Sequence, residues 1–252
     1  ALATIETLGI DGPFGVDVML EKARIVQDMD KADEALALLE SASVRFPSSR
    51  RARVELGEAL RQAERYTEAV AAYSAAIDLL PATRKQDWYL YFLRGVGYER
   101  MGRWSEAETD LRKALELNPD EPNALNYLGY SYLEQGRNIE EAKRLIARAV
   151  ELRPGDGFII DSLGWAYFMA GEYDQAVKHL EEAVAAEPGE PTINEHLGDA
   201  YWRVGRTIEA RFRWRAAMDS EPADDQSRRL LAKLELGLDG AAASTLQATR
   251  TR

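Results

Sequence analysis

Residues 157–190, GFIIDSLGWAYFMAGEYDQAVKHLEEAVAAEPGE, contain two helical patterns with a glycine between them. Gly171 is predicted to end the first helix, because glycine takes the left-handed turn conformation at little cost. The second helix is predicted over about 174–186 and stops before Pro188, whose ring cannot continue a helix. The stretch therefore predicts an antiparallel helix pair. The first helix presents one apolar face at the spacing i, i+3, i+4, i+7, formed by Ile160, Leu163, Gly164 and Tyr167.

The same pair recurs along the chain with a period near 34 residues. Alanines stand twelve and five residues before the proline that ends each copy. Three sets of residues with one period indicate an array of stacked helix pairs, in which no pair buries its apolar face alone. The prolines are separated by 34, 38, 35, 34 and 34 residues, at Pro47, Pro81, Pro119, Pro154, Pro188 and Pro222.

Small residues at fixed places, each beside a large one, are the signature of the tetratricopeptide repeat, which the chain resembles across residues 14–222. Lys22 and Arg94 depart from this signature, because a leucine is expected at the seventh place of the repeat. The resemblance implies an all-α fold, a right-handed α-solenoid of about six helix pairs with a C-terminal capping helix. The consensus glycine at the eighth place is present as Gly57, Gly95, Gly129, Gly164 and Gly198, with Ala23 in the first repeat.

The period also predicts the domain boundaries. Residues 1–13 lie on it and are predicted to be the remnant of a preceding repeat, so that the array would continue before Ala1. A capping helix is predicted over 223–238, and the tail 239–252 is predicted to be disordered because it has no apolar periodicity. The six repeats are predicted at 14–47, 48–85, 86–119, 120–154, 155–188 and 189–222.

Extra residues interrupt the period at two places. Four lie in the stretch 81–87 between the second and third repeats, and one lies in the turn 136–140. Insertions in repeat arrays fall in loops. The first insertion is either a longer connection or a bend that separates repeats 1–2 from repeats 3–6.

Composition excludes several classes of function. The net charge of −11 argues against a nucleic-acid partner, which needs clustered lysine and arginine. The chain has no cysteine, and no apolar run long enough to span a membrane, so we expect no direct membrane insertion. With only His179 and His196, and no phosphate-binding loop or nucleophile motif, we expect neither an enzyme nor a bound cofactor or metal. His179 is predicted to lie at the surface.

The resemblance further implies where a partner binds. In tetratricopeptide proteins the first helices line the concave surface, and places 2, 5, 9 and 12 of the repeat face its groove. Carried onto repeats 3–6, these places hold aromatic side chains interleaved with polar ones, an arrangement suited to holding a peptide or helix. The candidate residues are Phe92, Val96, Asn126, Tyr130, Leu133, Asp161, Trp165, Phe168, Glu195, Asp199 and Trp202.

Two other interpretations of these residues stay open. The aromatic side chains could touch neighbouring first helices and only thicken the core. Alternatively, the groove could be filled by the chain's own terminal segment or by a second copy. A known carboxylate clamp of the family uses lysine and asparagine at groove places, and the ninth places here, such as Val96 and Trp165, do not provide it.

The leading hypothesis is a non-catalytic scaffold or adaptor that binds a peptide or partner protein. Three segments (125–131, 161–165 and 194–199) are similar to those of bacterial envelope repeat proteins, among them proteobacterial lipoprotein adaptors that recruit a processing protease and its clients. That resemblance implies the periplasmic face of a cell envelope; the residues themselves leave the compartment unknown. The rivals are a structural module that self-associates and a regulatory repeat domain of a larger enzyme or envelope protein.

Overall fold

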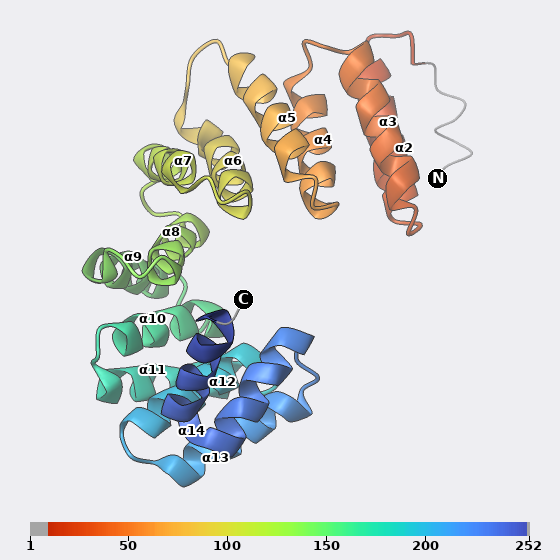
Figure 1. Ribbon diagram of the computed structural model, residues 1–252. Helices are drawn as coiled ribbons and strands as arrows, with labels where there is room; N and C mark the ends of the chain where they lie inside the picture. The colour runs from red at the N-terminus through yellow and green to blue at the C-terminus, as the bar shows by residue number, and fades with distance from the viewer. Residues whose placement is uncertain (1–9, 251–252) are drawn as a thin grey trace. The chain divides into compact units, whose positions relative to one another are not determined.

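The computed structural model describes residues 10–250, with side chains for residues 10–242. Within these residues the chain consists of helices and turns, without any strand (Figure 1). The chain divides into two compact units, Ala1–Pro119 (unit 1) and Asp120–Arg252 (unit 2). Most of the predicted remnant at 1–13 lies outside the described residues.

Unit 1 contains three helix pairs. The inserted stretch between the second and third pairs forms a short 3₁₀ helix, η1 (Lys85–Asp87), inside this unit. The chain thus divides after Pro119, one repeat later than this insertion. The pairs are α2 (Gly15–Gln27) with α3 (Ala32–Arg45), α4 (Arg50–Gln62) with α5 (Tyr66–Asp78), and α6 (Trp88–Arg100) with α7 (Trp104–Leu117).

Unit 2 contains three further pairs and a long last helix. Polar side chains cap the starts of its first helices: the Asp156 carboxylate, for example, accepts a hydrogen bond from the backbone N–H of Ile159 at 3.3 Å. The pairs are α8 (Pro122–Glu134) with α9 (Ile139–Leu152), α10 (Gly157–Met169) with α11 (Tyr173–Ala186), and α12 (Pro191–Arg203) with α13 (Thr207–Asp219), followed by α14 (Asp224–Arg250).

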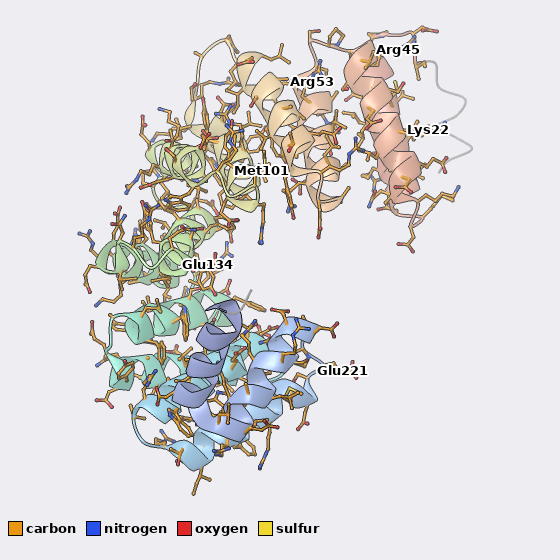
Figure 2. All side chains as sticks on the ribbon, viewed as in Figure 1. Lys22, Arg45, Arg53, Met101, Glu134 and Glu221 are labelled. Atoms are coloured by element: carbon orange, nitrogen blue, oxygen red, sulfur yellow. The ribbon has the colours of Figure 1, made fainter. Side chains whose placement is uncertain are left out.

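The last helix corrects the prediction for the C-terminal tail. Residues 239–250 are helical rather than disordered, and 251–252 lie outside the described residues. The helix follows a turn at Glu221, labelled in Figure 2, and is interrupted at Gly237, where φ is 73° and ψ is 174°. Alanine-rich sequence forms helix readily even without an apolar period. Leu238 and Ala241 are also buried, so packing stabilises this part of the helix.

A left-handed residue reverses the chain inside each pair. The prediction for Gly171 is confirmed, with φ of 79°, and the other three of the last four pairs also use glycine. In the first two pairs Asp30 and Glu64 take this conformation, each at φ 58°. Side chains with a Cβ are strained there, so these two turns are less favourable than the glycine turns. The glycines are Gly102, Gly136, Gly171 and Gly205.

The consensus glycines let the two helices of a pair touch. A Cβ added at Gly164 would lie 2.6 Å from Leu180 Cγ, and one added at Gly198 would lie 2.4 Å from the Trp214 ring. Leu180 and Trp214 are both completely buried. The small residue and its large partner therefore form one interlocking contact, which explains why both recur at the repeat period.

We expect Gly198→Val to lower the free energy of unfolding by about 2 kcal/mol, because the added groups overlap the buried Trp214 ring. Urea denaturation followed by circular dichroism measures this change. Gly189→Val is the matched control, since a Cβ at this loop glycine meets no atom within 4 Å. Equal stability of the two variants would contradict this account of the interlocking contact.

Candidate partner-binding surface

The first helices of unit 2 carry most of the candidate residues. Helix α10 contacts both α8 and α12, so the side chains of three repeats meet there. We call the face that these helices share the first-helix face, defined by Asn126, Tyr130, Trp165, Phe168 and Trp202. All five side chains are partly exposed.

Trp165 lies at the centre of an aromatic stack. Its ring is parallel to that of His196, with centroids 4.1 Å apart, and to that of Phe168, with centroids 4.6 Å apart. Phe168 in turn tilts against Tyr173 at 5.4 Å. The stack holds the Trp165 ring in place, while the side chain stays partly exposed.

Beneath the stack, a polar pair joins two neighbouring repeats. His196 Nδ1 lies 3.0 Å from both carboxylate oxygens of Asp161, and both residues are buried. Burial alone would lower the pKa of His196, but the nearby carboxylates of Asp161, Asp199 and Glu195 outweigh burial and raise it. The pair therefore holds α10 to α12 most strongly when the imidazole is protonated.

We expect His196→Gln to destabilise the protein by about 2 kcal/mol near pH 5 and by less near pH 9, since a hydrogen bond to a charged group is lost. A raised folded-state pKa stabilises at pH values below the unfolded pKa, and this contribution disappears as the pH rises through the folded pKa. The measurement is urea unfolding of both proteins across this range. His179 supplies a control of opposite sign, because burial lowers its pKa and makes its protonation unfavourable to folding.

Two predicted groove residues are instead buried against the last helix. Glu195 and Asp199 are each 4% exposed, and Lys233 Nζ donates to a carboxylate oxygen of both at 2.7 Å. Gln226 Nε2 donates to Glu195 at 2.9 Å, and Trp214 Nε1 donates to Asp199 at 2.9 Å. These contacts correct the expectation that both carboxylates face a ligand. The two carboxylates instead bind side chains of α14 and, for Asp199, also of α13.

Other candidate residues are also interior. Val96, Leu133 and Asp161 are buried, because at their places the side chains pack between neighbouring helices instead of facing solvent. In unit 1, Phe92 is partly exposed and lies 6.0 Å from the Trp88 ring. The interpretation that these positions thicken the core therefore holds for part of the predicted set.

Tyr130 and Asn126 extend the first-helix face onto α8. Burial, together with the carboxylates of Asp161, Glu134 and Glu195, raises the pKa of Tyr130 to about 12, so its hydroxyl stays protonated and able to donate. The Oδ1 atom of Asn126 is buried and accepts no hydrogen bond from the part of the chain that the structure describes.

Trp202 is the candidate that the chain itself covers. Its indole Nε1 donates to Asp239 Oδ2 at 3.3 Å, and Arg203 Nη1 donates to Asp239 Oδ1 at 2.6 Å. Asp239 belongs to α14 beyond Gly237. The open alternative of a terminal segment on the binding surface is therefore realised at this position.

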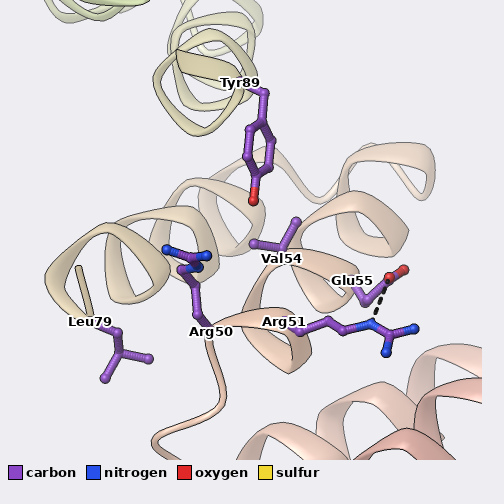
Figure 3. Close-up of a pocket in the computed structure, with 6 residues that line it drawn as sticks. All are labelled: Arg50, Arg51, Val54, Glu55, Leu79 and Tyr89. Carbon is purple, nitrogen blue, oxygen red and sulfur yellow. Dashed lines mark ion pairs between the residues drawn. The ribbon is translucent and has the colours of Figure 1, made fainter. Parts of the chain in front are cut away.

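Unit 1 has a separate hollow of about 510 Å³ between the start of α4 and α6 (Figure 3). Both of its arginines form ion pairs with carboxylates. Arg50 Nη1 lies 3.5 Å from Asp87 Oδ1, and Arg51 Nη1 lies 2.7 Å from Asp17 Oδ1. An anionic ligand would have to compete with these ion pairs. The lining residues are Arg50, Arg51, Val54, Glu55, Leu79 and Tyr89.

Sequence reasoning did not foresee a buried ion pair in unit 1. Arg94, which replaces the consensus leucine, donates from Nε and Nη2 to the two oxygens of Asp110 at 2.6 and 2.9 Å. Its Nη1 also donates to Ser74 Oγ at 3.2 Å. The only available signal was a charge at an apolar place, which calls for a buried partner of opposite charge.

The described residues contain no cluster of histidine and acidic side chains that could bind a metal ion. His179 is half-buried and stacks on Tyr167 at 5.2 Å, rather than lying fully at the surface. None of the described helices combines the length and apolar character needed to cross a bilayer.

The chain is similar in sequence and in fold to several known proteins. A curated relative, the mitochondrial import receptor subunit TOM70 of Rattus norvegicus, is 34% identical over 65 residues, which span 25% of this chain and 11% of the relative. Among solved structures, a chain of the APC/C hetero-tetramer Cut9-Hcn1 is similar, with a TM-score of 0.76 at 18% identity. The match covers 94% of this chain and 45% of the Cut9-Hcn1 chain. A tetratricopeptide repeat protein from Parabacteroides merdae has a TM-score of 0.73 at 19% identity, covering 93% and 92%.

Profiles of the tetratricopeptide repeat match residues 20–82, 92–157 and 167–234. Together with the helix pairs described above, these matches confirm the predicted α-solenoid of tetratricopeptide pairs. Repeats of this kind generally mediate protein–protein interactions. The chain belongs to the tetratricopeptide repeat family.

Proposed function

We propose that the chain is a non-catalytic scaffold that binds a peptide or a segment of a partner protein on the first-helix face of unit 2. The observation that carries this proposal is the partly exposed aromatic run of Tyr130, Trp165 and Phe168, supported from beneath by the pair between His196 and Asp161. Large aromatic side chains on a rigid base are the residues that most often dominate binding energy.

A polar group beside the aromatic run would set the orientation of a bound segment. The protonated Tyr130 hydroxyl would donate to a backbone carbonyl of that segment. A segment held through both its backbone and one or two apolar side chains fits this arrangement. The envelope location and a processing protease or its clients as partners rest on the resemblance of three segments and stay predictions.

We expect the double variant Tyr130→Ala, Trp165→Ala to bind at least about thirtyfold more weakly than the native chain, the loss typical of two anchors. The ligands are peptides selected from a displayed library against the whole protein, and fluorescence anisotropy measures their affinity. Ile208→Ala is the control, because this side chain is exposed on the second helix α13. Circular dichroism verifies that each variant is folded.

The proposal fails if no peptide is enriched, or if the double variant binds the selected peptides as well as Ile208→Ala does. Trp165→Phe separates binding from support of the array. It keeps an aromatic ring against His196, so an intermediate affinity with native stability indicates direct contact with the ligand.

A further inference from the structure

The chain beyond Gly237 folds back over the end of the first-helix face. A Cβ at Gly237 would lie 2.4 Å from the Trp202 ring, so the backbone of this kink rests on the indole. Leu238 joins the apolar core of unit 2, against which Trp202 and Phe168 also pack. We call residues 238–242 the latch, the part of this segment whose side chains are described.

Leu238 is the buried anchor of the latch, whereas its charged group is exposed. Among the described residues its ion pair joins Asp239 to Arg203, and the Asp239 side chain is 68% exposed. Exposed ion pairs contribute little to stability, because water solvates both partners well. The Trp202 Nε1 bond to Asp239 is long, at 3.3 Å.

The latch also packs incompletely against the helix it leaves. A cavity of about 140 Å³, partly open to solvent, lies between the two parts of α14, and the latch lines it with Leu238, Ala241 and Ala242. Apolar side chains that face such an opening lack part of the contacts that stabilise a packed interior. The lining residues are Arg229, Ala232, Lys233, Leu238, Ala241 and Ala242.

The part of α14 before Gly237 is held much more firmly. Lys233 and Gln226 bind the buried carboxylates of Glu195 and Asp199, and Leu230 is completely buried. A glycine with positive φ separates this firm part from the weakly held latch. The latch can therefore lift at Gly237 while the firm part continues to cover the end of the stack.

We infer that the latch is a displaceable internal ligand, and that the surface beneath it, formed by Trp202 and Arg203, docks an amphipathic helical segment of a partner. The contacts of the latch define the chemistry of that segment: a carboxylate in the place of Asp239, and an apolar side chain larger than alanine in the place of Ala241. Such a segment repeats the bond to Arg203 and fills the cavity. This inference rests on the proposed function, because it names the kind of partner that the first-helix face accepts.

Two full-length variants shift the latch in opposite directions. The opened variant, Leu238→Ala with Asp239→Ala, lacks the apolar anchor and the carboxylate of the latch. The tightened variant, Ala241→Leu, fills the cavity and so holds the latch more firmly. The probe is a fluorescent synthetic peptide of residues 237–252 carrying the same leucine at 241. Asp225→Ala is the control, since this exposed aspartate lies at the other end of α14.

We expect the opened variant to bind the peptide about tenfold or more tightly than the native chain, and the tightened variant to bind most weakly. Asp225→Ala binds like the native chain. Equal affinities in all four proteins, or no binding to the opened variant, would overturn the inference. The library peptides bound through Tyr130 and Trp165 are measured in the same series, and their binding judges the proposed function independently.

A ligand-free measurement covers the case in which the opened variant is less stable. The native chain has no cysteine, so spin labels on cysteines placed at exposed positions 208 and 242 report only the latch. We expect one short distance in the tightened variant and an added longer distance in the opened one. A single unchanged distance in both variants contradicts a displaceable latch.

Discussion

Replacing Lys233 with methionine is expected to lower the free energy of unfolding by about 4 kcal/mol, a large effect for one side chain. The ammonium group is the cation that Glu195 and Asp199 share, each at 2.7 Å, and all three side chains are nearly buried. Methionine keeps the apolar stem but removes the ion-pair partner of Asp199, and it leaves Glu195 only the more exposed Arg229, whose Nη2 lies 3.5 Å from Oε2. The carboxylates must then take up protons or bring in water, and both are unfavourable near neutral pH.

Urea unfolding of the full chain measures this effect. Lys178→Met on α11 is the matched control, because that lysine is exposed and its substitution should change stability by less than about 0.5 kcal/mol. Adding Glu195→Gln and Asp199→Asn to the methionine variant should restore part of the loss, since both buried charges are removed. If Lys233→Met and Lys178→Met were equally stable, the buried ion cluster would have no role in joining α14 to the array.

The helix pairs could be predicted from sequence because their determinants are local and periodic. Gly164 and its partner Leu180 lie in one repeat, and the same pair of small and large residues recurs at the repeat period. The turn at Gly171 needs only one residue that tolerates positive φ. Such features follow from the chemistry of single residues at fixed spacing, so they need no knowledge of what lies beside each helix.

The polar contacts between repeats could not be predicted in the same way. Asp161 and His196 are 35 residues apart, one more than the local period, and Asp199 and Lys233 are 34 apart, so each contact joins one repeat to the repeat or helix that follows it. The consensus assigns such places to a groove, but whether a carboxylate faces solvent depends on the side chain that the next repeat offers. Oppositely charged residues about one repeat apart in the sequence were the signal that could have predicted these contacts.

The tail shows a different limit of sequence reasoning. Its lack of apolar period argued for disorder, but a helix needs only a few buried contacts when the rest of its surface is polar and its propensity is high. Leu238 and Ala241 provide those contacts on the surface of unit 2. This part of the helix packs on the array itself. No pattern within residues 239–252 reveals that contact.

We expect Arg94→Leu, which restores the consensus leucine of the repeat, to destabilise the protein by about 3–5 kcal/mol rather than to stabilise it. Asp110 would lose both of its short hydrogen bonds, at 2.6 and 2.9 Å, while staying buried between α6 and α7. The measurement is urea unfolding of the full chain, compared with Lys22→Leu. Lys22 departs from the consensus at the same place of the first repeat, is labelled on α2 in Figure 2, and is partly exposed.

A double variant distinguishes the loss of the ion pair from the loss of packing around the guanidinium. Arg94→Leu with Asp110→Leu removes both charges and supplies apolar groups in their place, so most of the stability should return if the unpaired carboxylate caused the loss. If the double variant is as unstable as Arg94→Leu, the guanidinium acts through its packing against the Tyr91 and Tyr98 rings, each with its centroid 5.8 Å away. Lys22→Leu should stay within about 0.5 kcal/mol of the native chain, because its charge faces no buried carboxylate among the described residues. Restoring the consensus leucine is then costly in the third repeat and nearly neutral in the first, because α6 meets a buried acid and α2 does not meet one among the described residues.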